Sequence, residues 1–342
     1  MTNRQSMGRV AQPAMGQAAR PGTPQATRLG AGQAAQYGTR QATPVPTLDL
    51  LARPSGGFAM VAMDQRESLR QMFAAAVGER VGDERLTSFK LTVAREVGPY
   101  ASGFLIDQDY GFGQVAAGGM VPGGLIVAVD SLQQEPDGPV EDTGIDERVD
   151  LVAAREAGAV AAKLLLIWRD DERRERRLEI AAEFVRRCAD AGLLSVLEGV
   201  ARPDAGTAGF DGPAGTAGFD GPAAIREAAR ELAGLRPSLY KAQVPLGGAA
   251  PEERLVEECA RLDEVIPVPW VVLSQGVERD DFPAAVRAAC RAGASGMLAG
   301  RAIWSDVVGS DDLAAELRAR SVPRLQRLAA IVDEHARPWT AR

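Results

Sequence analysis

Residues 238–245 read Ser-Leu-Tyr-Lys-Ala-Gln-Val-Pro, a short apolar run with a lysine at its centre. Such a run is typical of a buried strand, where an ionic side chain is rare unless it is paired or functional. The chain has three lysines among its 39 basic residues, so arginine fills nearly every surface-cation role. Because a desolvated lysine can lose its proton and an arginine cannot, we expect Lys241 to be an amine nucleophile.

A second lysine, Lys163, lies in a similar run that continues as Leu-Leu-Leu-Ile-Trp. Two lysines in strands predict one shared site, and an amine nucleophile needs the lowered pKa that burial and a neighbouring cation both favour. For either lysine, the alternative is a side chain at a strand end that reaches solvent along its apolar stem.

From Asp49 onward, short apolar runs alternate with amphipathic stretches, which predicts a parallel sheet with helices outside it. Eight runs fit one α/β domain over 49–342, a closed (β/α)8 TIM barrel. A doubly wound open sheet is the alternative, although no Gly-x-Gly-x-x-Gly turn follows the first run. The expected strands are Phe58–Met63, Gly103–Ile106, Gly124–Val129, Ala161–Ile167, Leu193–Val200, Ser238–Val244, Trp270–Leu273 and Gly296–Ala299. The expected helices include Glu67–Val77, Glu84–Val97, Arg174–Ala191, Pro222–Ala233, Glu252–Leu262, Phe282–Ala292 and Asp311–Ala319.

In such barrels the chemistry lies at the C-terminal ends of the strands. Glu198, at the end of the fifth run, is the expected acid/base, and its alternative is an ion-pair partner of a lysine. A lysine amine converts a ketone or aldehyde into a protonated imine, which accepts electrons when a neighbouring carbon–carbon bond breaks. These residues therefore predict class I aldolase chemistry.

The last two runs end in Ser274-Gln275-Gly276 and Gly300-Arg301. Small residues leave backbone N–H groups accessible there, beside a hydroxyl and a guanidinium. Because barrels of this kind often bind phosphate after strands seven and eight, we expect an anion-binding cradle at these residues.

The totals argue against several other classes. A net charge of −7 gives no reason to expect nucleic acid or an anionic membrane as a partner, and no apolar run is long enough to span a bilayer. Three cysteines without paired spacing predict a reduced, cytoplasmic protein. The one histidine, His335, argues against a histidine-bound metal, and we expect no metal and no cofactor.

Two segments have the composition of loops. Residues 1–48 contain five arginines but no Asp or Glu, and we expect a disordered tail there. Residues 206–214 are repeated without change at 215–223, between the fifth strand and its helix. We interpret the repeat as a flexible loop lengthening of little functional effect, and a mobile lid is the alternative.

From about Gly57 to Glu334, the chain resembles the tagatose-bisphosphate and sulfofructose-phosphate aldolase family. These are class I enzymes on a (β/α)8 barrel. The resemblance rests on Met63-Asp64-Gln65-Arg66, Phe89-Lys90, Pro99-Tyr100-Ala101-Ser102, Leu164-Leu165-Leu166-Ile167-Trp168-Arg169, Leu239-Tyr240-Lys241, Pro269-Trp270-Val271-Val272-Leu273-Ser274 and Gly296-Met297-Leu298-Ala299-Gly300-Arg301-Ala302.

The resemblance implies that Lys241 forms the Schiff base with Glu198 and Lys163 as partners. It also implies that Asp64 and Gln65 face substrate hydroxyls, and that the expected cradle contacts an anionic end of a sugar phosphate. It suggests a homo-oligomer.

Within the family, residues 166–172, which include Arg169, are similar to the sulfosugar branch, and Asp107-Gln108 also leans that way. Tyr110-Gly111 leans to the tagatose branch, and Gln275 fits neither. The expected reaction is therefore cleavage of 6-deoxy-6-sulfofructose 1-phosphate into dihydroxyacetone phosphate and sulfolactaldehyde. Tagatose 1,6-bisphosphate cleavage and a non-catalytic sugar-phosphate-binding barrel are the alternatives.

Overall fold

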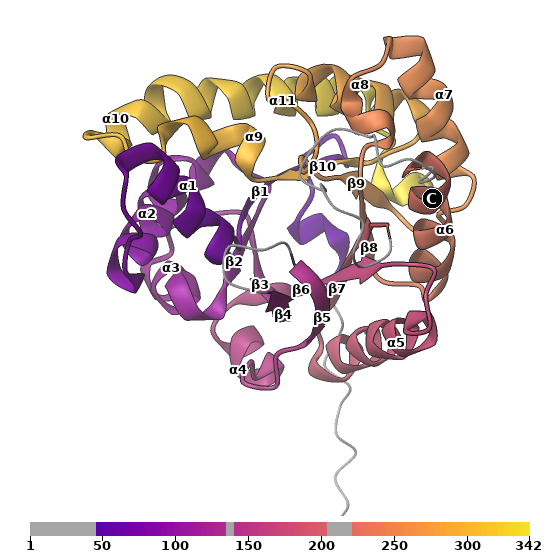
Figure 1. The fold of residues 1–342 in the computed structure, drawn as a ribbon, viewed down its shortest axis with the longest axis horizontal. Coiled ribbons are helices and arrows are strands. Elements are labelled where there is room, and N and C mark those ends of the chain that lie inside the picture. Colours follow the sequence, from indigo (N-terminus) through magenta and orange to yellow (C-terminus); the bar gives the residue numbers. More distant parts are fainter. Residues whose placement is uncertain (1–45, 135–139, 204–220) are drawn as a thin grey trace, which may run out of the picture. The chain divides into compact units, whose positions relative to one another are not determined.

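The computed structural model describes residues 46–134, 140–203 and 221–342. Eight parallel strands close into a barrel, and helices surround it (Figure 1). The expected TIM barrel is confirmed, and the open sheet is excluded. Each strand begins and ends within two residues of its predicted bounds. Around the barrel the order is β1 (Phe58–Met63), β10 (Gly296–Ala299), β9 (Trp270–Val272), β8 (Leu239–Ala242), β7 (Leu194–Ala201), β6 (Ala159–Trp168), β3 (Gly124–Ala128) and β2 (Gly103–Asp107).

The helices follow the amphipathic stretches. They are α1 (Glu67–Val77), α2 (Asp83–Glu96), α3 (Gly113–Gly118), α4 (Leu151–Glu156), α5 (Arg174–Ala191), α6 (Gly221–Gly234), α7 (Glu252–Asp263), α8 (Phe282–Ala292), α9 (Arg301–Trp304), α10 (Leu313–Glu316) and α11 (Val322–His335). The predicted bounds of α1, α5 and α8 match. The helix expected over 311–319 is instead one helical run that continues through a wider turn into α11. Pro323 lies in the first turn of α11, where a missing N–H does no harm.

Alternate side chains of each strand face two different cores, as the period of two in a strand requires. In β1, Phe58, Met60 and Ala62 pack inside the barrel, while Ala59 and Val61 pack against the helices. Gly296 lets β10 approach β1 closely, because a Cβ there would lie 2.0 Å from the carbonyl oxygen of Phe58.

An antiparallel hairpin, β4 (Asp130–Gln134) and β5 (Val140–Ile145), was not predicted. It connects β3 to β6 along the chain and forms a separate two-stranded sheet. Its sequence is polar because the two strands cross the barrel mouth instead of entering the core. The hydrophobic pattern that predicted the barrel strands is therefore missing.

Most of the two loop-like segments lies outside the described residues. The described part begins at Pro46, and Leu48 is buried at the start of a short helix, Leu48–Leu50. Of the repeat, the described residues are 221–223, which form the start of α6.

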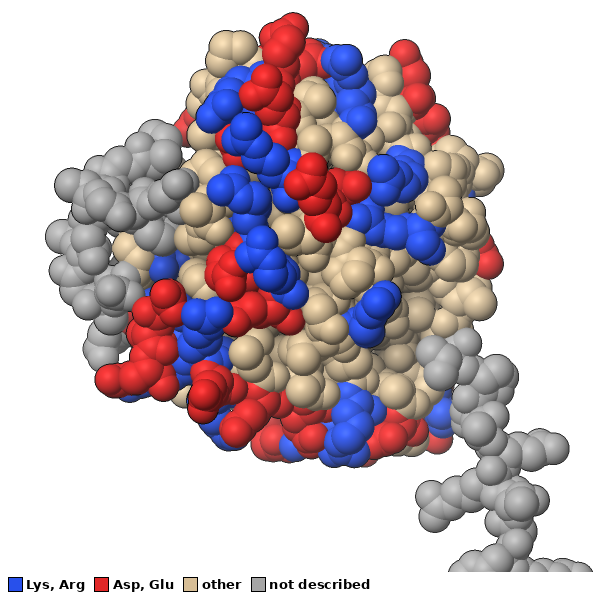
Figure 2. Space-filling model, turned by 90° about the vertical axis from the view of Figure 1, so that its right-hand side faces the viewer, with Lys and Arg blue, Asp and Glu red and all other residues tan. Residues whose placement is uncertain are grey.

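All three lysines are buried, so the basic groups on the surface in Figure 2 are arginines. Blue and red side chains lie side by side on this face of the molecule. The expectation that arginine fills nearly every surface-cation role agrees with this burial.

Lys90, on α2, forms an ion pair with Asp107 at the end of β2. Neither side chain is more than 1% exposed. Burial raises the pKa of Asp107 and lowers that of Lys90, and the charge of each partner opposes the effect on the other. The pair therefore joins α2 to the barrel. Burying the two charges costs free energy, and the attraction between them offsets that cost.

Lys90→Met should lower the free energy of unfolding by about 3–5 kcal/mol, because it leaves the Asp107 carboxyl buried without its cation. The double change Lys90→Met/Asp107→Leu should recover much of this loss, since two apolar side chains then fill the space. Urea unfolding followed by circular dichroism measures both. A single variant as stable as the unchanged protein would contradict the prediction.

Candidate active site

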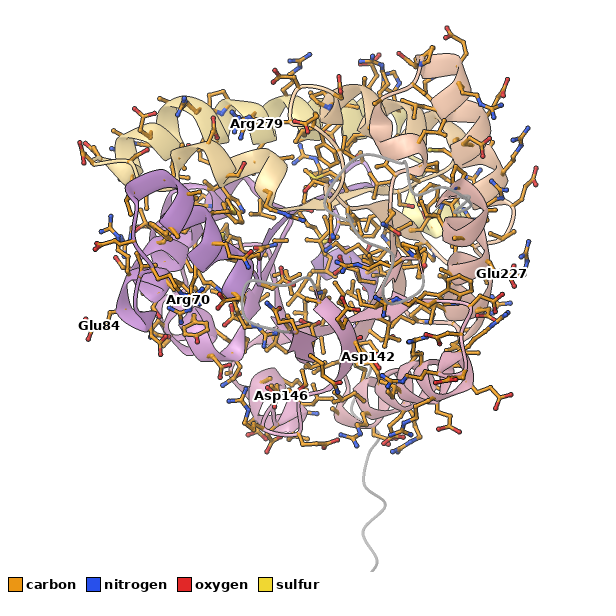
Figure 3. All side chains as sticks on the ribbon, in the orientation of Figure 1. Arg70, Glu84, Asp142, Asp146, Glu227 and Arg279 are labelled. Carbon is orange, nitrogen blue, oxygen red and sulfur yellow. The ribbon has the colours of Figure 1, made fainter. Side chains whose placement is uncertain are left out.

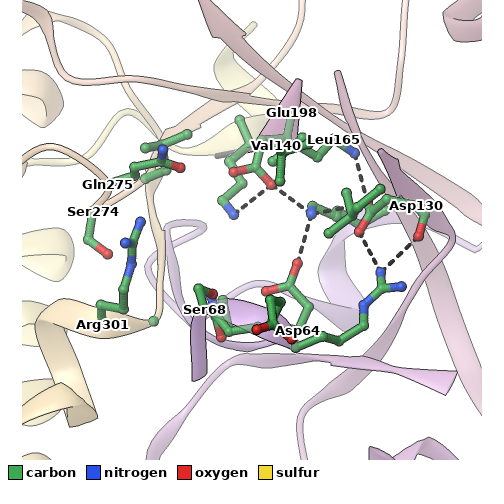
Figure 4. A pocket seen from close by; sticks show the side chains of 18 of the residues that line it. Asp64, Ser68, Asp130, Val140, Leu165, Glu198, Ser274, Gln275 and Arg301 are labelled. Carbon is green, nitrogen blue, oxygen red and sulfur yellow. Dashed lines mark hydrogen bonds and ion pairs between the residues drawn. The ribbon is translucent and has the colours of Figure 1, made fainter. Parts of the chain in front are cut away.

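A cavity of about 180 Å³ lies at the C-terminal ends of the barrel strands (Figure 4). The strand ends of β1, β6, β7, β8, β9 and β10 contribute to it, together with the β4–β5 hairpin. Its lining residues are Ala62, Asp64, Gln65, Arg66, Glu67, Ser68, Gln71, Asp130, Leu132, Gln134, Val140, Lys163, Leu165, Ile167, Glu198, Arg202, Lys241, Leu273, Ser274, Gln275, Leu298, Gly300 and Arg301.

Strand register brings the expected catalytic residues together. Glu198 on β7 lies beside Lys241 on β8. Lys163 on β6 pairs with Val196, one inward-facing position before Glu198. Inward side chains alternate with outward ones, so all three point into the barrel, where each is at most 4% exposed. The expectation that the two lysines share one site agrees with this arrangement.

One carboxylate joins the two ammonium groups. Oε2 of Glu198 lies 2.9 Å from Nζ of Lys241 and 2.9 Å from Nζ of Lys163. Nζ of Lys163 also lies 2.7 Å from Asp64 and 3.1 Å from Asp130. Lys163 is therefore the centre of three carboxylates that come from three different strand ends (Figure 4).

These contacts fix the charge of Lys163. Burial would lower its pKa, but Asp130, Asp64 and Glu198 outweigh burial and raise the pKa well above the ordinary lysine value. Asp64 shows the reverse balance: burial would raise its pKa, but the charges of Lys163 and Lys241 lower it below the ordinary value. The site thus contains a permanent ammonium and an ionised carboxylate next to it.

Lys241 has a different environment. Within the described residues, Glu198 is the one carboxylate within 4 Å of its Nζ, whereas Lys163 has three. An amine that must release its proton and attack a carbonyl is better placed with one carboxylate, which can also accept that proton. The geometry therefore favours Lys241 over Lys163 as the nucleophile.

Asp130 and Arg66 belong to the same network, and the sequence analysis did not include them among the site residues. Nη2 of Arg66 donates to the carboxylate of Asp130 at 3.1 Å and to its backbone oxygen at 2.8 Å. Asp130 is 2% exposed and also accepts from the N–H of Leu165. Their signal in the sequence was position alone, because each follows an expected strand.

The expected anion-binding cradle lies on the side of the cavity formed by β9 and β10. Ser274, Gln275, Gly300 and Arg301 all line it. A side chain at position 300 would not fit, since its Cβ would lie 2.7 Å from the carbonyl oxygen of Ala62 and 3.0 Å from Nε2 of Gln65. Only glycine lets the chain pass so close to β1 before α9 begins.

Four expected substrate-binding residues do not line this cavity. Asp107 is occupied by Lys90, and Gln108 is exposed in the turn after β2. Arg169 is 5% exposed and donates to Pro203 and Glu141. Gly276 follows Gln275 in a turn with φ of 77°. For Asp107, Gln108 and Arg169 a strand-end position was expected, but the direction of the side chain depends on neighbours that the sequence does not reveal.

Several cavity residues come from outside the barrel strands. Ser68 and Gln71 lie on α1, and Leu132, Gln134 and Val140 lie on the unpredicted hairpin. Among residues 46–134, 140–203 and 221–342, no group of three or more His, Cys, Asp or Glu side chains could hold a metal ion. None of the described helices is long and apolar enough to cross a membrane.

Comparison with solved structures identifies the same fold. Fructose-bisphosphate aldolase from Plasmodium falciparum superimposes with a TM-score of 0.61 at 15% identity, over 84% of this chain and 93% of that one. A Schiff-base-forming fructose-1,6-bisphosphate aldolase gives a TM-score of 0.51 at 17% identity, over 83% and 98%. At such low identity these likenesses show the fold alone.

Sequence relatives give a closer relation. Tagatose 1,6-diphosphate aldolase of Listeria monocytogenes serotype 4b is 29% identical over 85% of this chain and 92% of its own length. Tagatose 1,6-diphosphate aldolase 2 of Enterococcus faecalis is 28% identical over 86% and 95%. The model of the DeoC/LacD family aldolases matches residues 58–306, which include the whole barrel and every residue of the charged network. The chain therefore belongs to the DeoC/LacD family of aldolases, which are lyases.

Proposed function

We propose that this protein is a class I aldolase that cleaves a ketose 1-phosphate through a Schiff base on Lys241. One observation carries the proposal: Glu198 bridges Lys241 and a second ammonium, Lys163, which three carboxylates hold in the charged form. The half of the substrate that contains the imine carbon is expected to leave as dihydroxyacetone phosphate. A non-catalytic sugar-phosphate-binding barrel would have no need for this arrangement.

The residues divide the chemistry among them. The amine of Lys241 attacks the C2 carbonyl, and Glu198 transfers the protons that allow the C2 oxygen to leave as water. When the C3–C4 bond breaks, its electron pair enters the iminium and the C4 hydroxyl proton passes to a carboxylate, for which Glu198 is the candidate. Lys163 stabilises the negative charge that develops beside it, and Asp64 and Gln65 bind substrate hydroxyls. The enamine that remains then takes up a proton at C3, for which Glu198 is the candidate donor, and becomes an iminium again. Water adds to the iminium carbon, and dihydroxyacetone phosphate leaves as Lys241 is released.

For the substrate, we propose 6-deoxy-6-sulfofructose 1-phosphate, with sulfolactaldehyde as the second product. The resemblance of residues 166–172 to the sulfosugar branch supports it. The lining away from the cradle supports it too, because Ser68, Gln71 and Gln134 are neutral, Arg66 is already paired with Asp130, and Arg202 donates to the backbone oxygen of Val140. A sulfonate carries one negative charge where a phosphate carries nearly two, so it needs fewer cations.

Tagatose 1,6-bisphosphate is the second candidate. The names of the curated relatives favour it, since these relatives are tagatose 1,6-diphosphate aldolases. Arg169 would have helped to distinguish the two substrates by direct contact, but it lies outside the cavity lining. Both candidates use the same roles for Lys241 and Glu198.

Borohydride added with dihydroxyacetone phosphate should attach a covalent adduct to Lys241 and abolish activity, because reduction fixes the imine. Peptide mass spectrometry locates the adduct. Lys241→Arg should form none, since a guanidinium stays protonated. An adduct on Lys163 or Lys90 instead would show that the nucleophile is misassigned.

Lys163→Met should move the acidic limb of the pH–rate profile to higher pH by at least about one unit. The change removes the charge that lowers the pKa of Asp64, while burial, which raises that pKa, remains. Asp64 would then become protonated at a pH where it is now ionised. The measurement is kcat/KM for cleavage as a function of pH. Lys163→Arg keeps the charge and is the control: its acidic limb should stay in place even if the rate falls.

The unchanged enzyme should cleave 6-deoxy-6-sulfofructose 1-phosphate with a kcat/KM at least about tenfold above that for tagatose 1,6-bisphosphate. An unmet charge in a partly buried site costs on the order of 1–3 kcal/mol, about ten- to a hundredfold in rate. Competition between the two substrates in one reaction, followed by triose analysis, measures the ratio. A ratio near one or below it would favour the tagatose substrate and leave the role of Lys241 unaffected.

A further inference from the structure

The β4–β5 hairpin forms one wall of the cavity. Along β4, Asp130, Leu132 and Gln134 line the cavity, while Ser131 and Gln133 between them are exposed. This alternation is that of a strand with one face toward a ligand. Val140, the first residue of β5, completes the wall. The hairpin therefore contacts whatever the cavity binds, without providing any of the expected catalytic groups.

The wall stands opposite the anion-binding cradle. In the closed order of eight strands, β3 lies four strands from β9, and β6 lies four strands from β10. The hairpin connects β3 to β6, and the cradle follows β9 and β10. In Figure 4, the labelled Ser274, Gln275 and Arg301 lie on one side and Asp130 on the other. Lys163 on β6 and Lys241 on β8 both line the cavity. If the cradle holds the 1-phosphate, as is common after the last two strands of such barrels, the hairpin faces carbons 4 to 6 of the sugar.

The first strand of the hairpin is fixed by Asp130. Its carboxylate lies 3.1 Å from Nζ of Lys163 and accepts from the N–H of Leu165 at 2.9 Å. The root of the wall is thereby tied to the charged centre of the site.

The second strand is fixed by Arg169, from the residue after β6. Its Nε donates to the carbonyl oxygen of Pro203 at 2.9 Å, and its Nη1 and Nη2 donate to the backbone oxygen and the carboxylate of Glu141. Arg169 is 5% exposed and its bond to Pro203 is buried, so that bond is shielded from water and gains strength; the two bonds to Glu141 are partly buried. Glu141 is next to Val140, whose backbone oxygen accepts from the cavity residue Arg202 at 2.9 Å. The planar fork of Arg169 thus links β5 to the chain after β7.

We propose that Arg169 is a positioning residue that sets the place of Val140 and Arg202, and through them the choice of aldehyde half of the substrate. The inference rests on the proposed function and concerns the same cavity. Arg169 acts on specificity without touching the sugar. An Arg at this position supplies three donors in one plane, which lysine cannot do.

The neighbourhood offers a matched control. Arg173 lies in the same region and reaches the same hairpin strand, but its side chain is 63% exposed and its contact with Asp142 is 3.3 Å long. Asp142 belongs to β5 of the hairpin and is labelled in Figure 3. An exposed contact of this kind contributes little, so Arg173→Met should leave the wall in place.

The experiment separates the two halves of the substrate. Arg169→Lys keeps the charge and loses the fork. Its rate of borohydride trapping with dihydroxyacetone phosphate should stay within about twofold of the unchanged protein, since that half lies on the cradle side. Its kcat/KM for 6-deoxy-6-sulfofructose 1-phosphate and for tagatose 1,6-bisphosphate should fall about ten- to a hundredfold, mostly through KM. The ratio of kcat/KM for these substrates to kcat/KM for fructose 1-phosphate, which has no charge at C6, should move toward one.

A second variant covers the case in which Arg169→Lys does not fold. Glu141→Gln removes the charge of a side chain that is 45% exposed, and it should give a smaller shift in the same direction. Trapping that falls in step with cleavage would overturn the inference, because it would show that the whole site is distorted. Unchanged preference in both variants would overturn it as well. Failure of the unchanged protein to trap dihydroxyacetone phosphate would instead overturn the aldolase proposal, and this inference with it.

Discussion

The ammonium of Lys163 is the charge on which the rest of the site depends. Asp64, Asp130 and Glu198 enter the barrel mouth from three strands, and each is nearly or fully buried. Three carboxylates so close to one another would repel and take up protons if no cation lay between them. Lys163 lies within 3.1 Å of all three, and its charge lowers the pKa of Asp64. These contacts hold the end of β1, the hairpin and β7 around one point.

Lys163 and Lys241 differ in how many carboxylates surround them. Two lysines with equal partners would compete for the same role, but here one is surrounded by carboxylates and the other shares a single one. In the proposed mechanism, Glu198 receives a proton from Lys241 and remains in contact with Lys163. Both lysines are buried in similar strands, so what distinguishes them in the structure is the number of acidic neighbours.

Sequence patterns were sufficient to predict the barrel and to predict that Lys163, Glu198 and Lys241 lie close together. Lys163, Glu198 and Lys241 each stand in an apolar strand, and the period of two fixes the face to which each side chain points. Patterns failed where the direction of a side chain depends on distant partners. Arg169 looks like a substrate ligand in the sequence, but Glu141 and Pro203, which hold it away from the cavity, are 28 and 34 residues distant. The polar hairpin gave no hydrophobic signal at all.

Family membership defines the reaction better than the substrate, because the two depend on different parts of the structure. The lysines and Glu198 stand on barrel strands, whose register leaves little freedom for change. The wall opposite the cradle is built from a hairpin whose place depends on a few side-chain bonds to its backbone, at Glu141 and Val140. Such bonds can be altered without disturbing the barrel core. Members of one aldolase family at 28–29% identity can therefore share the residues of the barrel strands and still differ in the wall that faces the substrate.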